Sequence, residues 1–472
     1  MTAHPHKLAK LTVLLASLAL LPAAAQTSTP ASPAADENVT PFQEPPQIRF
    51  SGFGTLGGVH VRGNGAAFIR DLTQPKGARN QGVSFDIDSR LGLQANYPFN
   101  DQFEAVAQVV SRYNHDNNYR PELTWGFLKY TPNDTLKIRA GRVGYDAFIG
   151  ADTREVGYSY LWARPPIEYY GILLFPYIDG GDVVLRTPLL KGVGRVKLFT
   201  GMVRQEASAM MEQREWAGWA GNLNLPPIGS VQDLNKSRES GIFFEYQDNH
   251  WTARTGFNQL RITKGFPPGA TNMPALFQAT AGQAYAAGNP ALGNALTALV
   301  SDLDIVSKKT TFKSVELAYE NGSLRLQGAL ARMDSESLVA PTAHTGFFLA
   351  SYRFGRLTPY FTTAFIRPKR HTQPDQLAQL GAPPFIVDMT RFSVSGAAAR
   401  QESYTLGLRY ELTDTLALKL QTDFIRNQDC SPVSLPVMSP GTPCAPPMLW
   451  PTVPVGWNGR ANVYSATLDF IF

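Results

Sequence analysis

The stretch FDIDSRLGLQANY, Phe85–Tyr97, is the clearest alternating run in the chain. Its apolar residues share one parity: Phe85, Ile87, Leu91, Leu93, Ala95 and Tyr97. The other parity is polar: Asp86, Asp88, Arg90, Gln94 and Asn96. Successive side chains of a strand point to opposite faces, so this period of two predicts a β-strand with one apolar and one polar face.

The same alternation recurs from Ile48 onward, about ten residues at a time. In the last strand, Asn462–Phe472, one face carries Tyr464, Ala466, Leu468, Phe470 and Phe472, and the other carries Ser465, Thr467 and Asp469. Charged residues make up only 17% of the chain, and its 40 Gly and 35 Pro residues suit many turns. Together these features predict one large all-β protein.

The connections between the predicted strands are of two kinds. Seven are short: Pro98–Gln102, Thr131–Thr135, Pro188–Val193, Gln247–His250, Asn321–Ser323, Gly355–Thr358 and Thr413–Thr415. Eight are longer: Arg62–Gly82, Asn114–Pro121, Gly144–Tyr177, Arg204–Ser240, Thr263–Lys309, Asp334–Thr345, Pro368–Glu402 and Gln428–Arg460. Sixteen strands with tight turns at one end and long loops at the other predict a transmembrane antiparallel up-and-down β-barrel, because a soluble sandwich has no reason for this asymmetry.

The two faces of the predicted strands support this interpretation. One parity is apolar with aromatic ends, as in Tyr404, Leu406, Leu408 and Tyr410, which is typical of a lipid-facing wall. The opposite parity is polar, and from it we predict the pore-wall residues Asp86, Asp88, Arg90, Glu104, Arg112 and Arg409. A sixteen-stranded barrel is too wide for side chains to fill, so a polar interior predicts water.

The N-terminal residues predict export. Lys7 and Lys10 precede an apolar run, Leu11–Leu21, that ends in Ala23–Ala25, which is the pattern of a cleaved signal peptide. We therefore predict a signal peptide at 1–25, a flexible periplasmic leader at 26–46 and the barrel at 47–472, located in a bacterial outer membrane. Export also predicts a disulfide between the two cysteines, Cys430 and Cys444.

The segment Arg139–Gly171, RAGRVGYDAFIGADTREVGYSYLWARPPIEYYG, fits neither period in its middle part. It mixes both charge signs with aromatic residues, which suits a loop folded against a wet, polar wall. We predict that it narrows the pore through Arg139, Arg142, Asp152, Arg154, Glu155, Arg164 and Glu168, with a mild preference for anions. Two alternatives stay open: an exposed loop at the membrane interface, and a stapled loop in which Arg154 and Arg164 pair with Glu155 and Glu168.

With these strands in place, the chain resembles the porins of Gram-negative bacteria. The resemblance rests on FSGFGTLGG (Phe50–Gly58), SRLGLQ (Ser89–Gln94) and the terminal Phe472. It implies a homotrimer that passes small hydrophilic solutes, contacts lipid and lipopolysaccharide, and is inserted by the barrel-assembly machinery through its last strand. It also implies that the third external loop, Gly144–Tyr177, enters the barrel. The PEFGG-like stretch of classical porins is replaced by Trp162–Tyr169, so the chain looks like a divergent proteobacterial branch and no eyelet residue is carried over.

Other functions are poorly supported by the sequence. Gly52–Gly57 matches a dinucleotide-binding fingerprint, but it lies in a predicted strand without the required helix. The seven histidines show no metal spacing, and the Lys and Arg residues behind the net charge of +5 are dispersed, so we expect no metal, cofactor or nucleic acid. No G-x-S-x-G motif occurs, so we expect no enzyme; a membrane-embedded hydrolase, an adhesin, and a channel selective for organic acids or aromatic compounds remain alternatives.

Overall fold

We analysed a computed structural model of the chain. It describes residues 47–71, 73–171, 175–204, 206–208, 231–234, 236–264, 273–338, 340, 342–395, 400–428 and 457–472, which belong to one compact unit, Pro46–Phe472. Cys430 and Cys444 lie outside these residues, so their disulfide stays a prediction.

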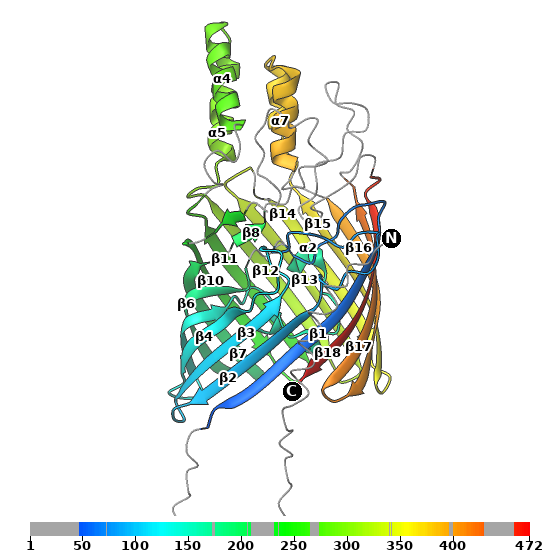
Figure 1. Ribbon diagram of the computed structural model, residues 1–472. Helices are drawn as coiled ribbons and strands as arrows, with labels where there is room; N and C mark the ends of the chain where they lie inside the picture. The colour runs from blue at the N-terminus through cyan, green and yellow to red at the C-terminus, as the bar shows by residue number, and fades with distance from the viewer. Residues whose placement is uncertain are drawn as a thin grey trace, which may run out of the picture. The chain divides into compact units, whose positions relative to one another are not determined.

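Sixteen antiparallel strands close into a single barrel, as predicted (Figure 1). Its strands are β1 (Arg49–Arg62), β2 (Arg90–Pro98), β3 (Phe103–Arg112), β4 (Glu122–Tyr130), β5 (Leu136–Gly144), β6 (Tyr177–Leu189), β7 (Gly192–Val203), β10 (Ser237–Gln247), β11 (Trp251–Arg261), β12 (Lys309–Glu320), β13 (Leu324–Ser335), β14 (Ala343–Tyr352), β15 (Leu357–Pro368), β16 (Gln401–Thr413), β17 (Leu416–Asn427) and β18 (Arg460–Ile471). β1 pairs with β18, which closes the ring. Two short strands, β8 (Glu206–Ser208) and β9 (Val231–Asp233), pair separately.

The seven predicted short turns join consecutive strands at one end of the barrel, which we call the turn end. The longer connections lie at the opposite end, the loop end (Figure 1). At the turn end β6 and β7 are joined only by Leu190 and Lys191, and Leu190 has a φ of 54°. Such tight links suit antiparallel neighbours and fix their register.

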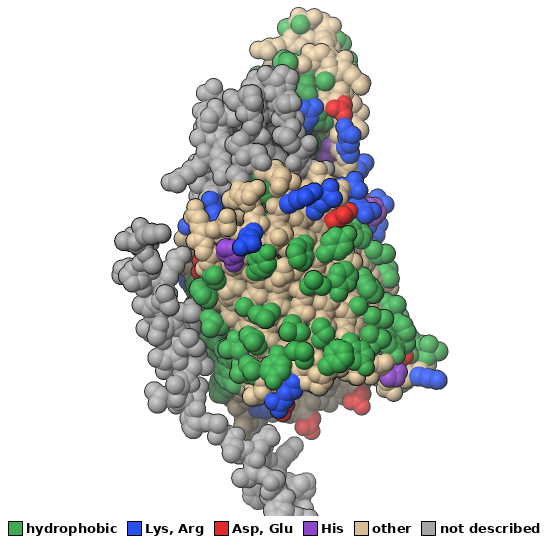
Figure 2. Space-filling view, turned by 90° about the vertical axis from the view of Figure 1, so that its right-hand side faces the viewer, with side chains coloured by type: hydrophobic (Ala, Val, Ile, Leu, Met, Phe, Trp, Pro, Cys, Tyr) green, Lys and Arg blue, Asp and Glu red, His purple; other side chains and the backbone are tan. Residues whose placement is uncertain are grey.

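The strands have one apolar and one polar face. On the outside, Leu406 is 56% exposed, and Figure 2 shows hydrophobic side chains spread over this surface. On the inside, Lys419 and Asp469 are 0% and 1% exposed and form an ion pair of 3.0 Å. The predicted division of β18, with Tyr464 and Leu468 outside and Thr467 inside, is therefore confirmed.

The predicted strand Phe85–Tyr97 was wrong at its start, since β2 begins at Arg90. The chain turns at 86–88, so Asp86 and Asp88 lie in the β1–β2 connection rather than on a strand. Before this turn Ser84 bonds to Val59 of β1, and after it the Ser89 hydroxyl accepts the Gly57 N–H at 3.1 Å. A Cβ at Gly57 would collide with Asp88, so this close approach requires glycine. Alternation of residue types continues through the turn, which is why the pattern misplaced the boundary.

In the described part of the chain, helices longer than one turn occur in two of the loop-end connections. The long connection Thr263–Lys309 contains α4 (Met273–Ala286) and α5 (Pro290–Leu303), which are separated at Gly288, whose φ is +74°. Two further helices were not predicted: α6 (Gln373–Gln379) and α7 (Pro384–Ser395), which share an apolar cluster with α4 and α5. Among the described residues, no helix is long and apolar enough to cross a membrane.

Candidate pore constriction

The β5–β6 connection, residues 145–176, contacts the inner face of strands far apart around the barrel. Near its start, Arg254 of β11 donates to the Asp146 carboxylate at 2.9 Å. Further along, the Trp162 indole donates to the hydroxyl of Thr362 on β15 at 2.8 Å, and Arg409 of β16 donates to the Tyr160 carbonyl at 2.6 Å. These contacts place the connection against the polar inner wall on several sides. It contains two 3-10 turns, η2 (Ala151–Thr153) and η3 (Gly157–Ser159), and the short helix α2 (Ile167–Tyr170).

The Glu155 carboxylate is shared by three arginines. Arg90 of β2 lies 3.2 Å from it, Arg112 of β3 lies 3.3 Å from it, and Arg154 reaches only to 4.0 Å. Burial alone would raise the pKa of Glu155, but Arg112, Arg154 and Arg70 hold it below its usual value. The arrangement brings two predicted wall residues and two predicted constriction residues into one charged group.

Arg164 forms a buried clamp across the barrel. Its guanidinium bonds to Asp88 of the β1–β2 connection and to Asp423 of β17, each at 2.8 Å. It stacks over Phe68 at 4.5 Å, and its side chain is 2% exposed. These partners differ from the predicted staple to Glu168, and a guanidinium with so little exposed surface cannot face a passing solute.

A second anchor lies at Gly157. The buried Lys419 ammonium of β17 donates to the Gly157 carbonyl at 2.7 Å while it pairs with Asp469. A Cβ at position 157 would collide with Asp469 and Thr55 of the wall. Glycine therefore lets the backbone of the connection approach the wall closely enough for Lys419 to reach it.

The C-terminal part of the connection is held by a buried carboxyl and by aromatic rings. Gln401 of β16 donates to Glu168 at 2.7 Å, and Thr345 of β14 donates to the Glu168 carbonyl at 2.6 Å. Burial raises the pKa of Glu168, because its hydrogen bonds to Gln401 and Ser403 compensate only part of the lost hydration. Tyr169 and Tyr170 pack on Phe347 of β14, with ring centroids 5.2 and 5.5 Å apart.

The other predicted residues lie elsewhere. Arg139 bonds to Asp182 of β6 with a shortest distance of 2.5 Å, and Arg142 bonds to Asp179 at 2.6 Å, so both are paired on the wall rather than beside Arg154. Glu104 pairs with Lys129 of the neighbouring strand. The remaining three are Asp152, which is exposed, Asp86, which accepts the Tyr119 hydroxyl at 2.9 Å, and Arg409, which pairs with Glu411 at 2.7 Å.

Sequence reasoning missed the role of the β1–β2 connection, residues 63–89, for which it predicted only a long loop at Arg62–Gly82 and a strand from Phe85. Phe68 and Ile69 are buried with Ile167 in one apolar cluster, and Arg70 binds Asp88 at 3.0 Å. The two connections thereby enclose a narrow pocket lined by Arg70, Asp71, Arg90, Phe148, Arg154, Glu155, Tyr160, Arg164, Pro165, Tyr170 and Gly171. The apolar run Ala66–Ile69 inside a long loop was the one available signal.

Comparison with known proteins gives a likeness of fold only. Neither models of protein families nor characterised protein sequences produced a match. Among solved structures, the barrel is similar to OmpF of Salmonella typhi in a complex with daunomycin, at 11% identity and a TM-score of 0.49, covering 91% of this chain and 98% of that one. It is also similar to an anion-selective porin from Comamonas acidovorans, at 12% identity and a TM-score of 0.48, covering 90% and 100%.

A third similar structure is OmpT, an outer-membrane-expressed protein of Vibrio cholerae, at 12% identity and a TM-score of 0.47, covering 91% of this chain and 98% of that one. Gram-negative porins are therefore among the solved structures that this barrel resembles. These identities and TM-scores are too low to support a conclusion about function, which must come from the residues of this chain.

Proposed function

We propose that this protein is an outer-membrane porin, a water-filled channel through which small hydrophilic solutes diffuse. The observation that carries the proposal is the closed barrel of sixteen strands with an apolar outer face and an inner face of charged side chains. An apolar outside suits lipid, and the buried charges of the inside need water or partners. The proposal includes the signal peptide at 1–25, the leader at 26–46, a homotrimer, and recognition of the last strand by the barrel-assembly machinery.

Residues 145–176 would narrow the channel, with Arg154, Glu155, Arg90 and Arg112 at the constriction. Arg154 is the best-placed solute contact, because its side chain is 14% exposed and its closest carboxylate oxygen is 4.0 Å away. Its guanidinium donates to the Phe175 carbonyl at 3.2 Å and keeps further N–H groups for an anion. A guanidinium with spare donors supports the mild anion preference.

A second candidate is a channel selective for organic acids or aromatic compounds. The pocket at the constriction favours it, because Arg70 and Arg154 offer donors to a carboxylate and the rings of Phe148 and Tyr160 offer apolar surface.

Reconstitution of the purified protein in a planar bilayer under a salt gradient tests the proposal. We expect discrete conductance steps and a reversal potential with the sign expected for anion selectivity. Bilayers that show no conductance steps would overturn the channel function. A reversal potential with the sign expected for cation selectivity would overturn the anion preference alone. Competition of benzoate and acetate with chloride would separate the selective channel from the general one, because only a selective channel distinguishes two monocarboxylates of equal charge.

A further inference from the structure

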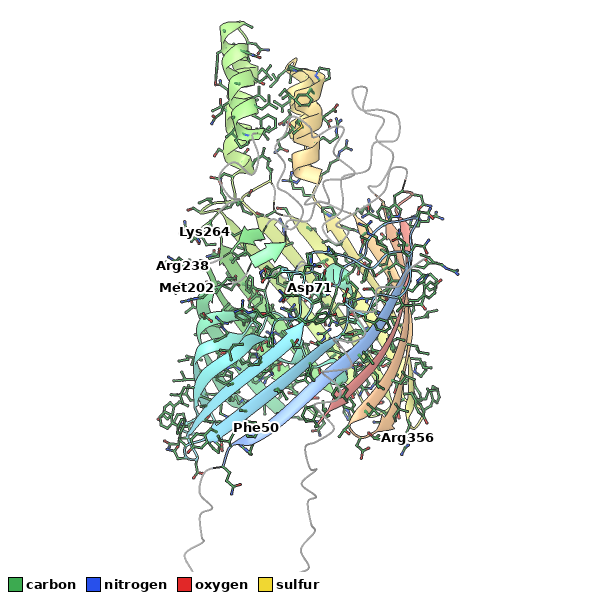
Figure 3. All side chains as sticks on the ribbon, in the orientation of Figure 1. Phe50, Asp71, Met202, Arg238, Lys264 and Arg356 are labelled. Atoms are coloured by element: carbon green, nitrogen blue, oxygen red, sulfur yellow. The ribbon has the colours of Figure 1, made fainter. Side chains whose placement is uncertain are left out.

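The β1–β2 connection, residues 63–89, also folds into the barrel. Two backbone hydrogen bonds close its tip, residues 68–78. The Phe68 N–H donates to the Ala78 carbonyl at 2.9 Å, and the Ala78 N–H donates to the Phe68 carbonyl at 2.8 Å. Figure 3 labels Asp71 of the tip at the height of the strands rather than beyond their loop end. The tip therefore takes up space that the wide interior of a sixteen-stranded barrel would otherwise leave to water.

Buried contacts hold the tip against the β5–β6 connection. Phe68 is 0% exposed and shares an apolar cluster with Ile167 of that connection. Asp88, at the other end of the β1–β2 connection, is also 0% exposed and bonds to Arg70 of the tip at 3.0 Å and to Arg164 at 2.8 Å. One buried carboxylate thus joins the two connections through their arginines, and its burial makes this link costly to break.

Hydrogen bonds within the β1–β2 connection fix the shape of the tip. The Arg70 N–H donates to the Gln74 side chain at 2.8 Å, and the Gln74 amide donates to the Ile87 carbonyl at 2.9 Å. The Thr73 N–H donates to the Asp71 carboxylate at 3.0 Å. Because Gln74 and Asp71 are buried, these bonds are stronger than they would be in water. The position of Arg70 and Asp71 is therefore set by the fold of the tip itself.

On its other side the tip faces β2 and β3. Asp71 lies 4.0 Å from Arg112 of β3, which also pairs with Glu155 of the β5–β6 connection at 3.3 Å. Asp71, Glu155 and Arg90 of β2 all line the pocket at the constriction, whose free volume is about 30 Å³. Such a volume holds about two water molecules. A larger solute can pass between the β5–β6 connection and this part of the wall only if the side chains of the tip give way.

We propose that the tip of the β1–β2 connection is a second constriction element, and that Arg70 and Asp71 determine the largest solute that the channel admits. The inference rests on the proposed channel function and deepens it. Arg154 is proposed to set the charge preference, whereas Arg70 and Asp71 carry opposite charges and limit the free space. Replacing both therefore leaves the net charge unchanged, so that an effect on permeation reports the size of the passage.

The test uses the full-length protein in planar bilayers and in liposomes. In the first variant, residues 69–77 are replaced by Asn-Gly, because a two-residue turn can join a hydrogen-bonded antiparallel pair such as Phe68 and Ala78. The anchors Asp88 and Arg164 remain. Because conduction is limited at the narrowest section, we expect at least about twofold higher conductance at high salt. Liposome swelling should show that the wild type admits arabinose and excludes sucrose, and that the shortened variant admits both.

A second variant tests the side chains alone and carries the test if the shortened variant does not fold. R70A/D71A keeps the backbone of the tip, and Asp88 keeps Arg164 as its partner. The matched control is K76A/Q81A, which changes two exposed residues of the same connection. We expect R70A/D71A to admit sucrose and the control to exclude it like the wild type. Circular dichroism of each variant in lipid checks that the barrel has formed.

Three results would overturn the inference: a wild type that admits sucrose as fast as arabinose, wild-type conductance and sucrose exclusion in both variants, or equal entry of sucrose through R70A/D71A and K76A/Q81A. The same measurements separate this inference from the proposed function. A wild type that conducts while any of these results holds would overturn the role of the tip and keep the channel. If neither the wild type nor a folded variant conducts, the channel function itself is overturned. If only the shortened variant and R70A/D71A conduct, the tip closes the barrel, which supports the inference and overturns free diffusion through the wild type.

Discussion

Arg154 and Arg164 belong to the same connection, yet their surroundings give them different tasks. Arg164 is 2% exposed and holds two carboxylates, Asp88 and Asp423, at 2.8 Å each. Arg154 is 14% exposed and approaches the shared carboxylate of Glu155 only to 4.0 Å. The two residues are of the same type, and each has a glutamate nearby in the sequence, so the sequence alone does not distinguish their roles. Burial and the number of nearby carboxylates make Arg164 a clamp and leave Arg154 partly exposed, as the charge that we propose for the pore.

The two glutamates of the connection differ in the same way. Glu155 sits among Arg90, Arg112 and Arg154, which lower its pKa against the effect of burial. Glu168 has Gln401 as its side-chain partner, and burial raises its pKa. The surroundings therefore stabilise the charged form of the Glu155 carboxyl and disfavour the charged form of the Glu168 carboxyl.

The largest effect should come from breaking the clamp. Replacing Arg164 with methionine keeps the apolar stem but leaves Asp88 and Asp423 without their shared cation in a buried site. Removing one partner of a buried ion pair costs about 3–5 kcal/mol. We expect R164M to lower the free energy of unfolding in lipid vesicles by about this amount, and R154M to change it by less than about 1 kcal/mol.

A triple variant sharpens this result. In D88N/R164M/D423N the two carboxylates that R164M leaves unpaired become neutral amides. Because the cost arises from uncompensated buried charge, most of the lost stability should return. Arg70, which also binds Asp88, would lose its partner and limit the recovery. A triple variant as unstable as R164M would show that Arg164 acts through packing on Phe68 instead.

The two glutamates should give pH dependences of opposite sign. Glu155 has a folded pKa below its usual value of 4.5, so the stability it contributes is present above pH 4.5 and is lost as the pH falls through the lowered pKa. Glu168 has a folded pKa above 4.5, so stability is highest below that pH and is lost as the pH rises through the raised pKa.

Denaturant unfolding of the wild type, E155Q and E168Q between pH 3 and 8 measures both effects. E155Q should be less stable than the wild type at pH 7 and approach it at low pH. E168Q should match the wild type at low pH and be more stable at high pH. Parallel curves for the wild type and either variant would contradict the corresponding pKa shift.

The sequence predicted the wall of this molecule far better than its interior. Alternation has a fixed physical cause, because adjacent side chains of a strand face lipid and lumen in turn. The turns and the sixteen strands followed from it, and the largest error in a strand boundary was the start of β2, where a turn at 86–88 happens to keep the alternation.

The interior depends on contacts between distant residues. Nothing near Arg164 in the sequence indicates Asp88 or Asp423, and Glu168, its partner in the alternative of a stapled loop, was simply the nearest acid. The β1–β2 connection was overlooked for the same reason. Phe68 and Arg70 contact their partners only after the barrel closes, because closure brings β1 and β17 to either side of β18. Helix α6 has Pro374 and Asp375 in its first turn, whereas α7 has Pro384 at its start but no acidic residue in its first turn and no basic residue in its last, so little separates these segments from a loop.

The smallest effect should appear in ion selectivity, and it concerns Arg154 alone. An uncompensated charge about 5 Å from a passing ion in water contributes roughly 0.8 kcal/mol. Because this charge attracts chloride and repels potassium by the same amount, R154A should reduce the permeability ratio of chloride to potassium by about fifteenfold at low salt, and R154K should keep the wild-type ratio because it keeps the charge. Since screening acts over about 10 Å at 0.1 M, the difference should shrink at higher salt. Reversal potentials at 0.01 and 1 M salt measure this, and an R154A value equal to that of the wild type at low salt would show that Arg154, like Arg164, only holds the connection in place.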